Sequence, residues 1–278
     1  MLNPAPNGYN NIIVAMGQSN MLGVGGSDSS TSISWFNSKT KTWEYGTTIA
    51  FPAGNSTATP AKFCIQKLSS IQPISLIPMA VSGSASSQWQ PGQPFFDNTL
   101  SLLKTLTQTK KIVAFLWMQG ENSGDRRQAS TYATRLEKIY QGLKSVFNPK
   151  TLFICGEISA KMGQSSIINQ QLHQWAATHH NTFTLSNSNL PTNPDNVHFI
   201  GSSLNTIGHL FSEVITKHYF NITPTPTPKS ASVSKTGDIA VLPKEILFDN
   251  LTLDGQILYN NVIIHGKIAF QSPSSSKA

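Results

Sequence analysis

Charged side chains are scarce in this chain of 278 residues, at 12% of the total. Apolar residues reach 38%, so much of the surface must be built from Ser, Thr, Asn and Gln. This composition excludes an intrinsically disordered chain, which combines few apolar residues with high charge. The net charge is +7, but the longest basic clusters are only Lys110-Lys111 and Arg126-Arg127. A nucleic-acid-binding surface is therefore not expected.

Cysteines and long apolar runs are also rare. The two cysteines, Cys64 and Cys155, lie in apolar segments, which favours buried free thiols and offers no metal-ligand spacing; a disulfide between them stays open. No apolar run approaches the ~18 residues of a membrane span. The first ten residues lack the basic start of a signal peptide. We therefore expect a chain without a Sec signal, cytoplasmic by default or exported by another route.

Strand-like and helix-like patterns alternate between residues 11 and 220. Unbroken apolar runs, typical of strands covered on both faces, occur at 12–16, 74–81, 112–118, 152–158 and 182–185. Helical spacing of apolar residues occurs at 60–70, 95–107, 130–147, 167–178 and 202–219. The alternation predicts an α/β sandwich around a mainly parallel sheet of these five strands. Ligands of such folds bind at the carboxyl ends of the strands.

The segment from residue 23 to residue 60 departs from this alternation. It is rich in Ser, Thr and Gly, and its pattern predicts a two-stranded hairpin that turns around residues 37–40. Long irregular insertions are often functional. Trp35, Trp43 and Tyr45 in this segment either wall a pocket or anchor the hairpin to the core.

The composition changes again after residue 222, the expected end of the first domain. Residues 223–237 form a Pro/Thr/Ser linker. A small β-rich module at 238–272 contains an eleven-residue repeat, 248–258 and 259–269, in which Asp254-Gly255 and His265-Gly266 predict turns between short strands. Asp249 and Asp254 are interpreted as turn formers. Two repeats are too few to stand alone, so we expect this module to pair with its own domain, a second copy or another protein.

Polar residues follow the predicted strands where a serine hydrolase would need them. Such an enzyme requires a nucleophile, a base, a group that orients the base, and donors for the oxyanion. Each residue alone has an ordinary explanation; a serine after a strand, for example, is usually a helix N-cap. The candidates, in chain order, are Ser19, Gly83, Gln119, Glu121, Asn122, Asp195 and His198.

Three motifs together resemble a known family. Gly17-Gln18-Ser19-Asn20-Met21, Trp117-Met118-Gln119-Gly120-Glu121 and Asp195-Asn196-Val197-His198 are similar to blocks of the SGNH (GDSL-like) hydrolase superfamily. Within it they most resemble the sialate O-acetylesterase and carbohydrate esterase family six branch, over residues 11 to about 220. The resemblance implies a three-layer, flavodoxin-like α/β/α fold. It also implies removal of O-acetyl groups from carbohydrates, of the acetylxylan or sialate type, without metal or cofactor.

The resemblance also implies a role for each matching residue. Ser19 is expected to be the nucleophile, His198 the base and Asp195 its orienting carboxylate. The oxyanion is expected to bind the backbone N–H groups of Ser19 and Gly83 and one side-chain amide.

The second and third blocks depart from the commonest pattern of the superfamily. The second block contains Gly83 but not the second glycine that many relatives have. The third block lacks the Gly-x-Asn-Asp sequence that is commonest in the superfamily. Gln119 is therefore the first choice for the amide donor and Asn122 the second. Gln18, Asn20, Glu121 and Asn122 are expected to brace the site or to bind substrate.

Other functions fit parts of the same pattern. The linker and repeat suit a non-catalytic carbohydrate-binding or structural protein that retains the hydrolase fold. Hydrolysis of lipid esters or thioesters has less support, since no apolar lid flanks the motifs. Trp89 either lines a sugar subsite or belongs to the core.

Overall fold

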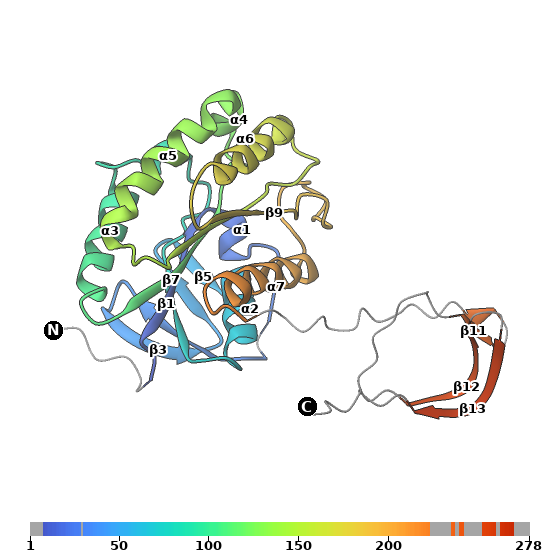
Figure 1. The fold of residues 1–278 in the computed structure, drawn as a ribbon. Helices are drawn as coiled ribbons and strands as arrows, with labels where there is room; N and C mark the ends of the chain where they lie inside the picture. The colour runs from blue at the N-terminus through green and yellow to red at the C-terminus, as the bar shows by residue number, and fades with distance from the viewer. Residues whose placement is uncertain are drawn as a thin grey trace. The chain divides into compact units, whose positions relative to one another are not determined.

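A computed structural model describes residues 8–28, 30–222, 235–236, 239–241, 252–259 and 262–269. The chain divides into two compact units, Met1–Thr223 and Pro224–Ala278. The first unit is an α/β fold in which helices cover both faces of a seven-stranded sheet (Figure 1). Its elements are β1 (Asn11–Gly17), α1 (Ser19–Leu22), β2 (Ile33–Asn37), β3 (Thr42–Gly46), β4 (Ile49–Phe51), β5 (Gly54–Ser56), α2 (Pro60–Leu68), β6 (Ile74–Pro78), α3 (Pro94–Leu106), β7 (Lys111–Met118), α4 (Ser123–Arg127), α5 (Tyr132–Leu143), β8 (Leu152–Gly156), α6 (Ser165–Ala177), β9 (Thr182–Leu185) and α7 (Gly201–His218), with short 3₁₀ turns at Ser86–Trp89, Ala129–Thr131 and Lys144–Val146.

The sheet has the strand order β3-β2-β6-β1-β7-β8-β9. All neighbouring strands are parallel except β2 and β3, which form the predicted hairpin. The five predicted strands are all present, but the expected strand number is wrong. The hairpin joins the same sheet because Trp35 of β2 pairs in parallel with Leu76 of β6. The sequence pattern predicts that residues 33–46 form a hairpin, but it does not identify the strand beside which the hairpin lies. The pairing of β2 with β6 could therefore not be predicted.

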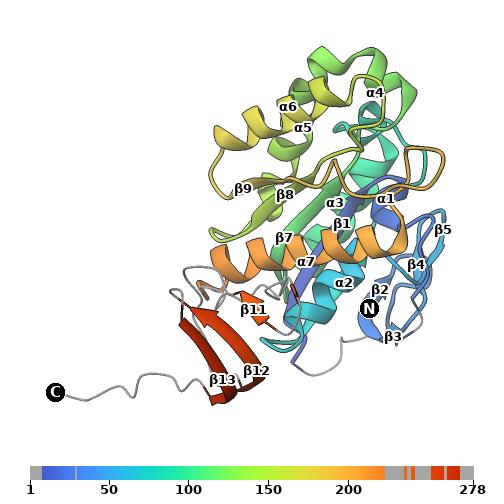
Figure 2. The same cartoon turned by 90° about the vertical axis from the view of Figure 1, so that its right-hand side faces the viewer.

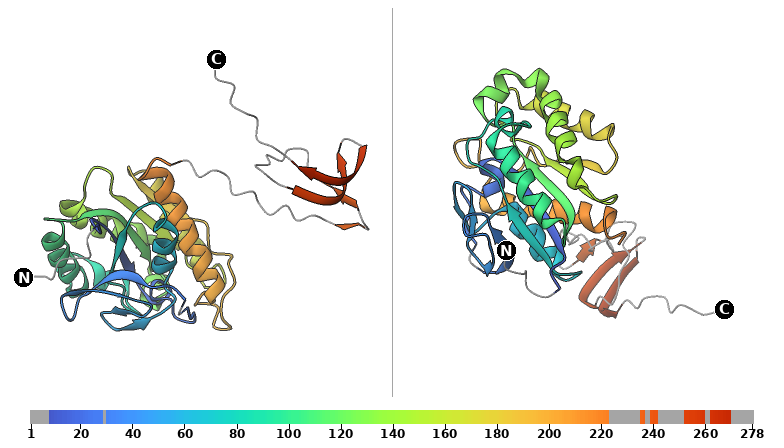
Figure 3. Two further views of the ribbon diagram at one scale, coloured as in Figure 1. Left: turned by 90° about the horizontal axis from the view of Figure 1, so that it is seen from below. Right: turned by 90° about the vertical axis from the view of Figure 1, so that its left-hand side faces the viewer.

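Residues of β1 alternate between two cores, one on each face of the sheet. Ile13 and Ala15 pack with α2 and α7, whereas Ile12 and Val14 pack with α3, α5 and α6. Figures 2 and 3 show this division, with α7 lying beside α2 on one face. The central strands are covered on both faces, which explains why they are continuously apolar.

The two cysteines are buried free thiols, as the sequence favoured. Cys64 of α2 belongs to the core on one face of the sheet, and Cys155 of β8 belongs to the core on the other. Burial raises the pKa of both thiols. Neither thiol is therefore reactive in the folded protein.

Most of the aromatic residues singled out in the sequence serve packing. Trp35 is 3% exposed within the core, and Trp43 meets Phe36 edge-on at 5.1 Å between ring centroids. Trp89 is fully buried, and its Nε1 donates to Ser84 Oγ at 2.9 Å. Tyr45 alone of these rings points to solvent, at 67% exposure. The hairpin tryptophans are therefore anchors, and Trp89 is a core residue.

A buried lysine holds the insertion between α1 and α2. Lys62 has no exposed surface, and its Nζ donates to the carbonyls of Asp28 and Thr57 at 2.8 Å and lies 3.2 Å from Asp28 Oδ2. A buried ammonium is tolerated when its hydrogen bonds are satisfied in this way. One residue of α2 thus fixes two parts of a segment with little regular structure.

The second unit contains a four-stranded sheet in the order β10-β11-β12-β13. Its strands are β10 (Lys235–Thr236), β11 (Ile239–Val241), β12 (Thr252–Tyr259) and β13 (Val262–Ala269). The predicted turns at Asp254-Gly255 and His265-Gly266 are wrong. Gly255 pairs with Gly266 inside the antiparallel β12–β13 ladder, and Asp254 pairs with Lys267.

The error has a simple cause, because an Asp-Gly pair is compatible with a strand when the residues around it are apolar and β-branched. Asp249, most of the predicted linker and both ends of the predicted module lie outside the described residues, and the proposed docking of the module stays a prediction.

Among the helices that the structure describes, no helix is long and apolar enough to cross a membrane.

Candidate active site

The first strand ends against its neighbour at Gly17. This residue has a φ of 115°, and a Cβ at its position would lie 1.9 Å from the carbonyl oxygen of Met118. Only glycine fits so close to another backbone. The chain then turns at Gln18, whose N–H donates to Met118 O at 2.8 Å, and enters α1 at Ser19. Ser19 is thereby held at the carboxyl edge of the sheet.

Ser19, His198 and Asp195 form one hydrogen-bonded chain. His198 Nε2 lies 2.9 Å from Ser19 Oγ, although 179 residues separate the two, and His198 Nδ1 lies 2.6 Å from Asp195 Oδ2. Hydrogen bonds from the His198 side chain and from the backbone N–H groups of His198 and Val197 lower the pKa of Asp195 to about 2. Asp195 is therefore an anion across the working pH range and holds the imidazole in one orientation.

Asn20 connects the serine loop to the histidine loop. Its Nδ2 donates to Val197 O at 3.0 Å, and its Oδ1 accepts from the N–H of Phe199 at 3.0 Å. These two residues flank His198 in the chain. Asn20 has no exposed surface, and its amide holds the backbone on both sides of His198.

Glu121 is the third member of this support. Its Oε1 accepts from Asn20 Nδ2 at 2.7 Å, whereas its Oε2 is buried without a partner among the described residues. Burial raises the pKa of this carboxyl, while the Asn20 hydrogen bond and the nearby His198 oppose the shift. The contact with Asn20 fits a bracing role.

Two backbone N–H groups near Ser19 lack acceptors. The N–H groups of Ser19 and Gly83 donate to no acceptor in the described part of the chain. Gly83 has a φ of 71°, which its lack of a side chain permits. Its loop is tied to β1 because the N–H of Val81 donates to Gly17 O at 2.9 Å and Ser84 Oγ to the same oxygen at 3.3 Å.

The two candidate amides differ in their hydrogen bonds. Gln119 is fully buried, and its Nε2 donates to Asp125 Oδ2 and to Ser84 O at 3.1 Å, with Gln18 Oε1 a more distant acceptor at 3.4 Å. The two shorter bonds account for both of its amide hydrogens. Asn122 caps α4 through Oδ1, which accepts from Gly124 N at 2.7 Å, and its Nδ2 donates to Gly83 O at 2.7 Å. One hydrogen of Asn122 is left over.

Sequence reasoning missed the residues that hold Gln119. Asp125 is 2% exposed and accepts from Ser86 N and Arg135 Nη2 as well as from Gln119. Tyr132 donates to Gln119 Oε1 at 2.8 Å. In the sequence, Asp125 is marked only by its position four residues after Glu121. Its contact with Gln119 could not be predicted from that position, because the burial of Asp125 depends on how α4 packs.

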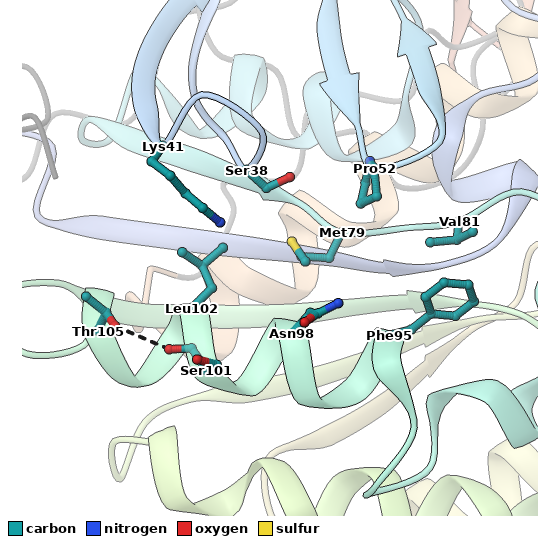
Figure 4. A pocket seen from close by; sticks show the side chains of 10 residues that line it. All are labelled: Ser38, Lys41, Pro52, Met79, Val81, Phe95, Asn98, Ser101, Leu102 and Thr105. Carbon is teal, nitrogen blue, oxygen red and sulfur yellow. Dashed lines mark hydrogen bonds between the residues drawn. The ribbon is translucent and has the colours of Figure 1, made fainter.

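Ser19 is 4% exposed, whereas its two partners in the hydrogen-bonded chain reach the surface. The side chains of His198 and Asp195 are 24% and 46% exposed. A cavity of about 560 Å³ lies elsewhere, between the hairpin turn and α3, with Lys41 on one side and Phe95 and Asn98 on the other (Figure 4). The described residues contain no group of three or more His, Cys, Asp or Glu side chains that could hold a metal ion.

Several solved structures resemble the first unit. A protein from Arabidopsis thaliana has 20% identity and a TM-score of 0.65, covering 78% of this chain and 100% of its own. NanS has 14% identity and a TM-score of 0.57, covering 78% and 99%. A carbohydrate acetylesterase from Xanthomonas citri has 13% identity and a TM-score of 0.53, covering 76% and 56%. These likenesses support the fold.

Family membership rests on a match to a family model. The family model described as carbohydrate esterase, sialic acid-specific acetylesterase, matches residues 9–217. No curated protein matches the chain. The matched range contains every polar group described above at the carboxyl edge of the sheet. The chain therefore belongs to the carbohydrate esterase family of sialic acid-specific acetylesterases, and it is a carboxylic ester hydrolase.

Proposed function

We propose that the protein removes O-acetyl groups from carbohydrates, of the acetylxylan or sialate type, with Ser19 as nucleophile, His198 as base and Asp195 as its orienting group. The observation that carries the proposal is the continuous contact from Ser19 Oγ to His198 Nε2, at 2.9 Å, and from His198 Nδ1 to Asp195 Oδ2, at 2.6 Å. A hydroxyl bonded to an oriented imidazole is the arrangement that activates a serine.

The chemistry proceeds in two steps. Ser19 Oγ attacks the acetyl carbonyl carbon while its proton passes to His198 Nε2, and the developing imidazolium is stabilised by Asp195. The imidazolium then protonates the departing sugar oxygen, which leaves an acetyl-serine. A water molecule, deprotonated by His198, attacks this ester, and acetate leaves as Ser19 regains its proton.

The oxyanion of each tetrahedral intermediate needs donors that are not already used. The N–H groups of Ser19 and Gly83 have no described acceptor. Of the two amides, hydrogen bonding favours Asn122, because both hydrogens of Gln119 are engaged by Asp125 and Ser84. A single donor of this kind contributes about 3 kcal/mol to transition-state stabilisation.

The partial exposure of His198 and Asp195 supports a glycan substrate. An acetyl group on a sugar is small, whereas the sugar and its attached chain are bulky and hydrated. Ser19 is 4% exposed beside the partly exposed His198, so a small acyl group can approach its Oγ while the glycan stays outside. Three cavities among the described residues, of about 560, 470 and 330 Å³, are lined by neither Ser19 nor His198.

Acetate release tests the proposal. The substrates are p-nitrophenyl acetate, acetylated xylan and O-acetylated sialic acid. Ser19→Ala and His198→Ala should reduce kcat/KM by at least about 10³-fold, since the triad members act as a unit. Ser101→Ala, an exposed serine on α3, is the matched control and should retain wild-type activity. An unchanged rate in Ser19→Ala would exclude the assignment.

A further inference from the structure

The loop that carries Gly83 ends at a buried serine. Ser86 lies three residues after Gly83, begins the 3₁₀ turn Ser86–Trp89 and is 1% exposed. Its N–H donates to Asp125 Oδ2 at 3.0 Å, and its Oγ donates to Asp125 Oδ1. Its carbonyl accepts from Gln90 Nε2 at 3.1 Å. Because every polar atom of Ser86 is engaged in this way, the position of the end of the loop depends on Asp125.

Packing does not hold Gly83 itself. Gly83 is exposed, and apart from its chain neighbours no described heavy atom lies within 4 Å of the point where a Cβ would stand. The loop begins at Val81, whose N–H donates to Gly17 O at 2.9 Å, and the carbonyl of Gly83 accepts from Asn122 Nδ2 at 2.7 Å. The direction of the Gly83 N–H is therefore set by hydrogen bonds at its own carbonyl and at the two ends of the loop.

Arg135 of α5 is the counterion of the carboxylate that holds Ser86. Its Nη2 lies 3.3 Å from Asp125 Oδ1, and its Nε donates to Ser86 Oγ at 2.6 Å. The side chains of Arg135 and Asp125 are 13% and 2% exposed. Among the described residues, no other Lys, Arg or His pairs with Asp125. A carboxylate in such a place needs an opposite charge and hydrogen bonds to offset its lost hydration.

The guanidinium group is itself fixed in one orientation. Its Nη1 donates to Thr131 Oγ1 at 2.7 Å, and its Nη2 donates to Gln128 O at 3.2 Å. The backbone of Arg135 also reaches the loop, because its carbonyl shares the Gln90 Nε2 donor with the carbonyl of Ser86. The planar guanidinium can donate to Asp125 and to Ser86 Oγ at once, which a lysine ammonium on a flexible stem cannot reproduce.

We propose that Arg135 is a positioning residue for the oxyanion site. It neutralises Asp125 and donates to Ser86, and so it fixes the end of the loop 81–86 and the direction of the Gly83 N–H. The inference rests on the proposed function, in which that N–H binds the oxyanion. Arg135 acts through Asp125 and Ser86 and is not assigned a contact with the reacting atoms.

The proposal predicts a loss of kcat with little change in KM. A donor to the oxyanion stabilises the transition state more than the neutral ester, so its misdirection affects the chemical step most. A displacement of about 1 Å can slow a reaction about 10²-fold. In the full-length protein, Arg135→Met should therefore lower kcat for p-nitrophenyl acetate about 10²-fold, with KM within about twofold. Arg135→Lys keeps the charge without the planar fork and should lose about tenfold.

Lys62→Met is the matched control for a purely structural effect. It breaks another ion pair of a buried side chain, that of Lys62 with Asp28, and should lower the melting temperature while kcat of the folded protein stays within about twofold. Lys138→Met removes an exposed cation from the same helix as Arg135 and should change neither quantity. If Lys62→Met loses as much kcat as Arg135→Met at equal loss of stability, the effect is structural and the proposal is overturned.

A double variant tests whether Arg135 acts through the charge of Asp125. Arg135→Met/Asp125→Asn removes both charges; the new amide can still accept from Ser86 N–H and can donate to Ser86 Oγ, which has lost its arginine donor. We expect kcat to recover to within about tenfold of the wild type, because the two substitutions are coupled. A double variant no faster than Arg135→Met would contradict the proposed route.

Hydrogen exchange separates this proposal from the esterase assignment. Measured without substrate, peptides that span residues 81–89 should exchange about tenfold faster in Arg135→Met and at the wild-type rate in Lys62→Met. Faster exchange supports Arg135 as the residue that fixes this loop, even if the wild type proves inactive and the proposed function fails. Hydrolysis that Ser19→Ala abolishes but Arg135→Met leaves unchanged keeps the esterase function and refutes the positioning role, whether or not exchange changes.

Discussion

At the residue scale, the site is built from amides whose hydrogen atoms are almost all committed. Asn20 uses both ends of its amide to position His198, and Gln119 uses both of its hydrogens on Asp125 and Ser84. Asn122 differs because its cap fixes the direction of the amide and leaves one hydrogen unused. Availability of a donor, more than its residue type, therefore distinguishes the candidates for oxyanion binding.

Asn122→Ser tests this distinction. Serine keeps the ability to cap α4 but lacks the amide donor, so we expect kcat to fall about 10²-fold with little change in KM or melting temperature. Gln119→Met, its counterpart, removes buried hydrogen bonds and should mainly lower the free energy of unfolding, by about 2 kcal/mol. If Gln119→Met is instead stable but inactive, Gln119 and not Asn122 is the amide that binds the oxyanion.

Glu121→Gln separates bracing from acid–base chemistry. Glutamine keeps an oxygen for Asn20 Nδ2 and should retain activity within about threefold, whereas Glu121→Ala should not. Burial raises the pKa of Glu121 in the folded protein, so wild-type stability declines as pH rises above the unfolded pKa. The variant does not titrate there. Chemical unfolding between about pH 4 and pH 8 should show that the free energy of unfolding of Glu121→Gln increases relative to that of wild type as pH rises.

At the scale of elements, Ser19 and Gln119 each follow a strand, β1 and β7, and parallel strands bring such ends to one edge. Asp195 and His198 lie instead in the segment between β9 and α7, and their pairing with Ser19 was expected from the resemblance of the three motifs to the SGNH superfamily. The partners of Gln119 could not be predicted, since Asp125 reaches it only through the fold of α4. The hairpin's place in the sheet was equally inaccessible, because alternating side chains do not specify which strand lies beside them.

The insertion between α1 and α2 depends on a single buried ammonium. Lys62→Met should lower the free energy of unfolding by about 3 kcal/mol, because the carbonyls of Asp28 and Thr57 lose their donor. Lys67→Met, an exposed position on the same helix, is the control and should be neutral within about 0.5 kcal/mol. Equal effects in urea unfolding would show that the buried contacts contribute nothing.

The same contacts predict a pH dependence. Burial favours the neutral form of Asp28, but hydrogen bonds from Ser30, Lys62 and Gln66 outweigh it and lower its pKa to about 2. A depressed carboxyl pKa stabilises the fold above the unfolded value and ceases to do so as pH falls through the folded value. The stability difference between wild type and Asp28→Asn should therefore be constant above about pH 5 and shrink between about pH 4 and pH 2.

At the scale of the whole molecule, catalysis is assigned to the first of two units. The family match, residues 9–217, lies within Met1–Thr223, and so does every proposed site residue. A chain ending at residue 222 should hydrolyse p-nitrophenyl acetate with kcat/KM within about twofold of the full chain. A large loss would mean that the unit Pro224–Ala278 contributes to the site. Loss of self-association or partner binding alone would support the docking role predicted for the repeat.

Labelling of the two buried thiols can measure local unfolding on each face of the sheet. Cys64 and Cys155 lie on opposite faces of one sheet, so a thiol reagent can label each only when the helices on that face detach. Mass spectrometry of peptides after a labelling pulse would time the two faces separately. Equal labelling rates would indicate that the layers separate in one cooperative event; faster labelling of one cysteine would identify the layer that yields first.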